Sequence, residues 1–145
     1  MSHHLSLADI KFKKDVEACT FPVSDFDHRS HLRLAYLYLV ENEADEAVRL
    51  MRNALLGLLN KAGVDPSAKF HETLTRAWVL AVQHFMECTA ESGPADDFID
   101  KNPAMLDSKI MLSHYSAEVL FSDKARHAFV EPDLEPIPDP GENNT

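Results

Sequence analysis

The stretch that decides the fold class is ADEAVRLMRNALLGLLNKA, residues 44–62. Its apolar residues recur every three or four positions, as at Val48, Met51 and Leu55, and this spacing gives an α-helix one apolar face. Acidic residues open the stretch, where the helix dipole favours negative charge, and Gly63 follows it, where helices commonly end. We therefore predict an amphipathic helix that buries one side.

Three further segments show the same periodicity, and they cover residues 25–41, 66–87 and 103–120. Pro66 and Pro103 each follow a residue that can cap a helix, and proline fits the first helical turn. The chain has only four glycines, which favours long helices joined by few turns. Short loops place consecutive helices antiparallel, so we predict an all-α fold, an up-down bundle of four main helices.

Short extra helices are predicted over residues 7–18, 95–100 and 123–129. Prolines make residues 131–138 extended, and the last residues, 139–145, are expected to be disordered. The sequence contains no internal repeat and no change of composition that indicates a domain boundary. We therefore predict one helical domain over residues 1–138, which ends in an extended proline-rich segment.

Charge and cysteine content exclude several classes of function. The chain of 145 residues has a formal net charge of −10, which disfavours binding to nucleic acid and to anionic membrane surfaces. It contains no apolar run of the roughly 20 residues that a membrane span needs, and residues 1–15 lack the apolar stretch of a signal peptide. Cys19 and Cys88 match neither a metal motif nor a disulfide framework. These features predict a cytoplasmic protein.

The histidines distinguish this sequence from a plain helical bundle. His28 and His31 lie three residues apart on the apolar face of their helix, and His71 begins the apolar face of another. In an up-down bundle these two helices start at the same end, and the helix over residues 103–120 returns to it with His114. We therefore expect four inward-facing histidines at one end of the bundle.

Such a cluster would suit a divalent metal. The predicted ligands are His28, His31, His71 and His114, since imidazoles from several helices can bind zinc, iron or copper. Glu72, beside His71, could add an oxygen ligand or act as a general base. The sequence contains neither Glu-x-x-His nor His-Glu-x-x-His, which counts against a ferritin-like di-iron site and excludes a zincin.

Two metal-free interpretations remain open. His28 and His71, with Glu72, could perform general acid–base catalysis because the pKa of imidazole is near neutral. Alternatively, the free N–H groups of two helix N-termini could hold a small anionic ligand. Its predicted substrate-binding residues are Arg33 and Arg76, together with Tyr115.

Structural interpretations of the same residues are also open. A histidine that faces the inside of a bundle is often a core residue whose nitrogens bond to nearby carbonyl groups. The sequence contains no glycine-rich phosphate loop and no Gly-x-Ser-x-Gly motif, which removes most nucleotide-binding folds and the common serine hydrolases. No strong catalytic motif is left.

Three stretches, residues 26–39, 69–78 and 115–134, resemble a group of small, uncharacterised bacterial helical proteins. The first is FDHRSHLRLAYLYL, the second KFHETLTRAW, and the third YSAEVLFSDKARHAFVEPDL. The resemblance implies an all-helical fold and a bacterial cytoplasmic setting. It implies no activity, cofactor or partner.

Two hypotheses of different class follow. The first is a small helical enzyme or ligand-binding protein whose pocket is lined by histidines at one end of the bundle, with or without a divalent metal. The second is a regulatory or interaction module that acts through an apolar helix face, for example as a homodimer.

Overall fold

The computed structural model describes residues 2–3, 5–65, 69–89 and 91–137. Its α-helices are α1 (Leu7–Glu17), α2 (His28–Glu41), α3 (Ala44–Lys61), α5 (Glu72–Cys88), α6 (Ala95–Lys101), α7 (Ala117–Leu120) and α8 (Asp123–His127). Its 3-10 helices are η1 (Val23–Asp25), η2 (Pro103–Leu106) and η3 (Ser108–Ser113). The only strands in these ranges, β1 (Ser2–His3) and β2 (Glu91–Ser92), pair in parallel. The predicted all-α class is confirmed, whereas the predicted tail of residues 139–145 lies outside the described residues.

Side-chain caps define where several helices begin. Asp27 accepts a hydrogen bond from the backbone N–H of Ser30 at the start of α2, at 2.9 Å. His71 does the same for Leu74 at the start of α5, at 3.1 Å. These bonds satisfy backbone donors that have no partner inside the helix. Within the predicted helix 66–87, α5 therefore begins after the cap residue His71, and Lys69 precedes this cap. Residues 66–68 lie outside the described residues.

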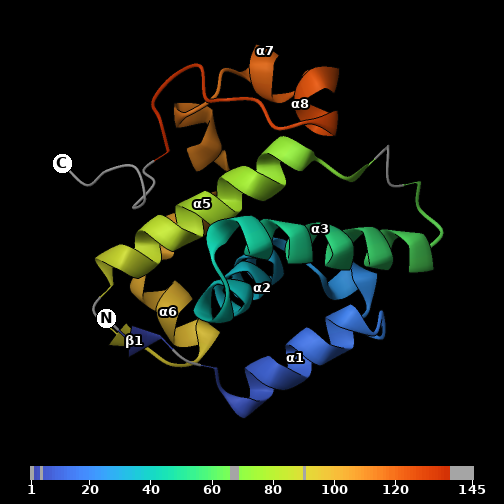
Figure 1. Cartoon of the computed structure of the whole chain (residues 1–145), viewed down its shortest axis with the longest axis vertical. Helices are drawn as coiled ribbons and strands as arrows, with labels where there is room; N and C mark the ends of the chain where they lie inside the picture. The colour runs from blue at the N-terminus through green and yellow to red at the C-terminus, as the bar shows by residue number, and fades with distance from the viewer. Residues whose placement is uncertain (1, 4, 66–68, 90, 138–145) are drawn as a thin grey trace.

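The helices are not arranged as an up-down bundle. Figure 1 shows α2 nearly end-on, while α3 and α5 run across the view in opposite directions. α2 thus crosses both helices, and it packs against each of them. The other side of α5 packs against α8 (Figure 1). The C-terminal segment, residues 103–137, also reaches α2 directly, because η2 contacts α2.

The prediction of one long helix over residues 103–120 is wrong. Asp107 has an extended backbone between η2 and η3, and its carboxylate accepts from the N–H of Lys109 at 3.0 Å. Ser116 is likewise extended and caps α7 through the N–H of Val119. Side chains that bond to the nearby backbone compete with the helix. The segment is therefore divided into short turns.

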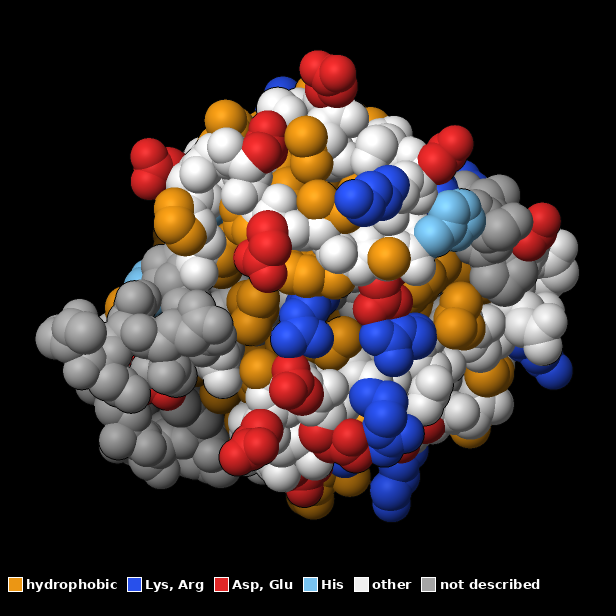
Figure 2. Space-filling model, turned by 45° about the horizontal axis from the view of Figure 1, so that its top comes forward, with side chains coloured by type: hydrophobic (Ala, Val, Ile, Leu, Met, Phe, Trp, Pro, Cys, Tyr) orange, Lys and Arg blue, Asp and Glu red, His pale blue; other side chains and the backbone are white. Residues whose placement is uncertain are grey.

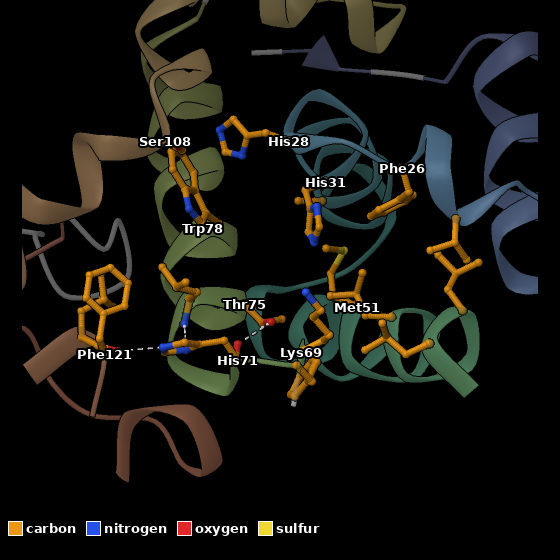
Figure 3. Close-up of a pocket in the computed structure, with 18 of the residues that line it drawn as sticks. Phe26, His28, His31, Met51, Lys69, His71, Thr75, Trp78, Ser108 and Phe121 are labelled. Atoms are coloured by element: carbon orange, nitrogen blue, oxygen red, sulfur yellow. Dashed lines mark hydrogen bonds between the residues drawn. The ribbon is translucent and has the colours of Figure 1, made fainter. Parts of the chain in front are cut away.

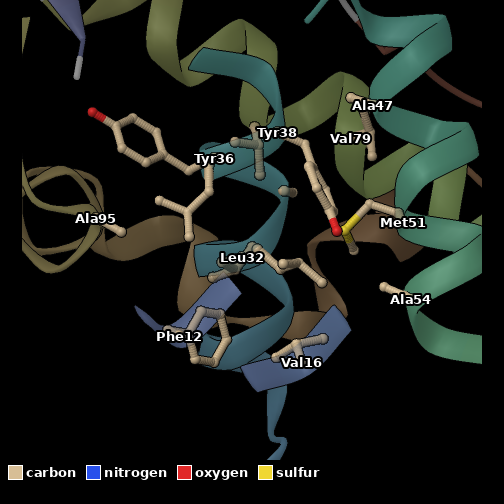
Figure 4. Packing of buried hydrophobic residues seen from close by; sticks show 14 of the residues in the cluster. Phe12, Val16, Leu32, Tyr36, Tyr38, Ala47, Met51, Ala54, Val79 and Ala95 are labelled. Atoms are coloured by element: carbon tan, nitrogen blue, oxygen red, sulfur yellow. The ribbon is translucent and has the colours of Figure 1, made fainter. Parts of the chain in front are cut away.

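The main core lies among α1, α2, α3, α5 and α6. It includes Phe12, Leu32, Tyr36 and Val79, which are all buried (Figure 4). The ring of Tyr36 stacks on Phe98 of α6 with 4.5 Å between ring centroids. These contacts join the N-terminal helices to α6 in one apolar unit.

A smaller apolar cluster joins α5 to the C-terminal segment. Its buried members are Ala77, Ala81, Met111, Tyr115, Leu120 and Ile137. The helices of the described ranges include none that is both long and apolar enough to cross a bilayer.

Candidate functional site

A pocket of about 500 Å³ lies between α2, α3, the first turns of α5 and the C-terminal segment. Figure 3 shows side chains from these elements converging on it. α3 contributes Met51, Leu55, Leu58 and Leu59, and α5 contributes Leu74 and Trp78. This volume is within the range that holds small organic ligands.

The pocket has apolar walls and basic polar groups. Its polar side chains among the described residues are His28, His31, Lys69, His71, Thr75, Ser108 and Lys109. No aspartate or glutamate of the described chain lines it. This distribution is notable in a protein with a net charge of −10, and it gives the pocket a local preference for anions or neutral molecules over cations.

His71 has no free ring nitrogen. Its Nε2–H donates to the carbonyl oxygen of Leu120 at 2.7 Å, and its Nδ1 accepts from the N–H of Leu74 at 3.1 Å. Burial lowers the pKa of His71, assisted by the positive charge of Arg126, against the opposing effect of its bond to Leu120. A neutral imidazole with both nitrogens bonded joins α5 to α7, which is a structural role rather than the predicted catalytic one.

His28 is bonded through one nitrogen. Its Nε2 lies 2.8 Å from the carbonyl oxygen of Met105, to which it donates. The edge of its ring contacts Trp78, with 4.7 Å between ring centroids. His28 therefore connects α2 with both α5 and the C-terminal segment, and it forms one wall of the pocket.

His31 has a free nitrogen that points into the pocket. Its Nδ1 lies 3.3 Å from the carbonyl oxygen of Asp27, to which it donates, while its Nε2 has no hydrogen-bond partner in the described chain. Figure 3 shows the free end of the ring pointing into the pocket above Met51. Burial lowers the pKa of His31, against a smaller raising effect of the Asp27 bond. The neutral ring thus presents a lone pair to the pocket.

Lys69 and Lys109 provide the cationic groups of the pocket. Neither ammonium group has a carboxylate partner among the described residues. By contrast, the guanidinium groups of Arg29, Arg52 and Arg76 are paired with carboxylates. The two lysines are therefore available to a ligand.

The four predicted metal ligands do not form one cluster. His114 does not line the pocket, and its Nδ1 lies 2.7 Å from the carbonyl oxygen of Glu135. Because residues 103–120 are divided into turns, His114 does not return to the end where His28 and His31 lie. Across the described ranges, no group of three or more histidine, cysteine, aspartate or glutamate side chains has a geometry that could hold a metal ion.

Glu72, the predicted general base, faces α3 instead of the pocket. Its carboxylate forms a two-point ion pair with Arg52, at 2.8 and 2.5 Å. Such a pair holds the start of α5 against α3. The structure does not bring Glu72 to a histidine that could share its proton, so no acid–base pair forms here.

The predicted substrate-binding residues are also occupied by structural contacts. Arg33 donates to the buried carboxylate of Asp9 at 2.9 Å, and Arg76 pairs with Asp45 at 2.8 Å. The hydroxyl of Tyr115 donates to the carbonyl oxygen of Val130 at 2.6 Å. None of the three lines the pocket.

Several pocket residues were not predicted as site residues. Phe121 and Leu112 lie on the rim and remain 61 % and 40 % exposed. Figure 2 shows apolar side chains interspersed with acidic and basic ones on the face toward which the C-terminal segment lies. Phe121 comes directly after a predicted helix, and nothing in the sequence there indicates that its side chain is exposed beside a pocket. Lys69 belongs to no recognisable sequence motif.

Comparison with protein-family models, with curated proteins and with solved structures finds no match to this chain.

Proposed function

We propose that this protein binds a small, mainly apolar organic molecule in the pocket between α2, α3, α5 and the C-terminal segment. The observation that carries the proposal is a cavity of about 500 Å³ with aliphatic and aromatic walls and few polar groups. Pockets of this size and composition are the usual sites for small ligands. The free Nε2 of His31 provides a hydrogen-bonding group that can orient the ligand.

Binding is favoured over catalysis by the contacts of the histidines. A general acid or base needs a nitrogen that can exchange a proton with the substrate. His71 has none free, and Glu72 is bound to Arg52. His28 and His31 each keep one free nitrogen, but no carboxylate of the described residues lines the pocket to serve as its partner. A catalytic pair of these residues would require the start of α5 to rearrange.

The experiment uses the neutral probe N-phenyl-1-naphthylamine, whose fluorescence rises in apolar surroundings. Trp78 is the only tryptophan of the chain and lines the pocket. We expect saturable binding, accompanied by energy transfer from Trp78 to the probe. A probe that stays dark, or that binds without quenching Trp78, contradicts the proposal.

Two variants locate the probe. Ala35→Phe places a ring where Ala35 borders the pocket, and we expect at least tenfold weaker binding. Leu112→Arg places a charge on the exposed rim without changing the core, and we expect a similar loss. Ala62→Phe, at an exposed position outside the pocket, is the matched control.

A second candidate function is an interaction module. Large apolar side chains are exposed at Leu106, Phe121 and Leu134, all in the C-terminal segment. Exposed apolar surface of this kind can bind another protein or a second copy of the chain. Sedimentation equilibrium tests self-association, and a stable dimer that Phe121→Ser abolishes would favour this candidate.

A further inference from the structure

We propose that the ligand is a single-chain carboxylic acid whose head group is bound between His31 and Lys69. The inference rests on the proposed function and specifies its ligand class. It starts from the position of the polar groups in the pocket. Figure 3 shows the ring of His31 and the side chain of Lys69 pointing toward each other across the cavity.

The head-group site has one free imidazole nitrogen and one free ammonium group. The Nδ1 of His31 is bonded to the carbonyl oxygen of Asp27, so its ring is oriented and only Nε2 remains for a ligand. Lys69 has no carboxylate partner in the part of the chain that the structure describes. A carboxylate has two oxygens: one can accept from the ammonium group of Lys69, and the other can accept from Nε2 of His31 once that nitrogen is protonated.

The remaining lining suits a hydrocarbon chain. Leu55, Leu58 and Leu59 of α3 line the cavity together with Leu74 and Trp78 of α5. An apolar cavity of about 150 Å³ binds benzene. The pocket, at about 500 Å³, therefore accommodates roughly 20 non-hydrogen atoms at the same packing. A twelve-carbon acid fits within this limit.

The charges around His31 couple binding to a proton. The groups that face it are His28 on its own helix, Lys69 from the connection before α5, and the cap residue Asp27, whose carboxylate is bonded to Ser30. Burial lowers the pKa of His31, so the ring is neutral in the empty pocket. A bound carboxylate reverses this preference because it stabilises the protonated ring. Binding therefore takes up a proton.

The experiment is displacement of N-phenyl-1-naphthylamine by dodecanoate, dodecanol and dodecylamine, each below its micelle concentration, at several pH values. We expect dodecanoate to bind at least ten times more tightly than either other compound at pH 6.5. Its affinity should fall as pH rises from 6.5 to 8, by up to about tenfold per pH unit for one linked proton. The affinity of dodecanol should not change with pH.

Matched variants test which residues bind the head group. His31→Gln should remove the pH dependence and most of the preference for dodecanoate, while His84→Gln, outside the pocket, should leave both unchanged. Lys69→Gln should weaken dodecanoate binding at least fivefold. Lys61→Gln, at an exposed position outside the pocket, should leave it within twofold, and Lys109→Gln, in the same pocket, should weaken it less than Lys69→Gln does.

The outcomes separate this inference from the proposed function. Equal binding of dodecanol and dodecanoate would overturn the carboxylate assignment, yet the bound probe would still support an apolar ligand. A loss in Lys109→Gln with none in Lys69→Gln would overturn the proposed head-group position. If the neutral probe itself does not bind, the proposed function fails, and this inference fails with it.

Discussion

The body of the molecule and its C-terminal segment are held together in different ways. In the body, α1, α2, α3, α5 and α6 enclose a continuous apolar core. The C-terminal segment consists of short turns with a smaller apolar cluster. Several of its contacts with α5 are hydrogen bonds to backbone groups, made by His71 and Thr73. The pocket lies at the boundary between the two regions, where hydrogen bonds to backbone groups replace continuous apolar packing.

This difference explains why a pocket exists. A long fourth helix packed along α5 would press its own apolar side chains against the first turns of α5. The short turns instead reach α5 at separate points, such as the bond between His71 and the carbonyl oxygen of Leu120. The bonds set the position of the segment, and they leave Leu112 and Phe121 on the pocket rim.

The largest expected effect is in the body. Leu32→Ala should lower the free energy of unfolding by about 3 kcal/mol because it leaves a cavity in the core, where Leu32 is fully buried. Denaturant titration followed by circular dichroism measures this value. Leu7→Ala, at a residue that is 87 % exposed, should change it by less than about 0.5 kcal/mol. Equal effects would contradict the assignment of the core.

Removal of the His71 side chain should act mainly on the C-terminal segment. His71→Ala leaves the N–H of Leu74 and the carbonyl oxygen of Leu120 without their partner, at a cost of about 1–3 kcal/mol. We expect faster hydrogen exchange in α7 and α8 and little change in α2. Uniformly faster exchange throughout the chain would show that the two regions form one cooperative unit.

Thr73 offers a sharper test with a built-in control. Its hydroxyl donates to the carbonyl oxygen of Ala128 and accepts from the N–H of Val130, so Thr73→Val should cost about 1–2 kcal/mol. The hydroxyl of Thr75 bonds only locally, to the carbonyl oxygen of the cap residue His71. Thr75→Val should therefore cost less, and thermal unfolding compares the two. A larger loss in Thr75→Val would contradict the role of the Thr73 bonds.

The smallest effect is the pH dependence of stability. The folded protein lowers the pKa values of His31 and His71 below 6.5, so the unfolded chain binds more protons near that pH. The free energy of unfolding should therefore fall as pH drops from about 7 through 6.5 and below. His31→Gln combined with His71→Gln should reduce this slope. A slope that is unchanged in the double variant would contradict the neutral state of both rings.

Much of the helical structure could be predicted from the sequence. The period of the apolar residues in α3 gave its bounds closely, because one buried face requires that spacing. Four histidines were expected at one end of a bundle; His28, His31 and His71 line the pocket, and His114 does not. The three lie together because α2 and α5 begin near each other, although α2 crosses α5.

The rest of the structure could not be predicted from the period of the apolar residues. It depends in part on side chains that compete with the helix for backbone hydrogen bonds. Asp107 and Ser116 act as caps inside what looks like a continuous helical pattern, and His114 is displaced as a result. The roles of Arg33 and Glu72 depended on partners distant in sequence, Asp9 and Arg52. Such pairing is set by the three-dimensional arrangement and has no local sequence signal.

The most direct test of the central claim is an NMR titration of the ¹⁵N-labelled protein with N-phenyl-1-naphthylamine. We predict saturable shifts at the Trp78 indole N–H and at the backbone amides of Ala35, Leu55 and Leu74, which line the pocket. The resonances of α1 should remain unchanged. Shifts confined to the exposed apolar residues, such as Leu134, or no shifts at all, would contradict a ligand pocket at this position.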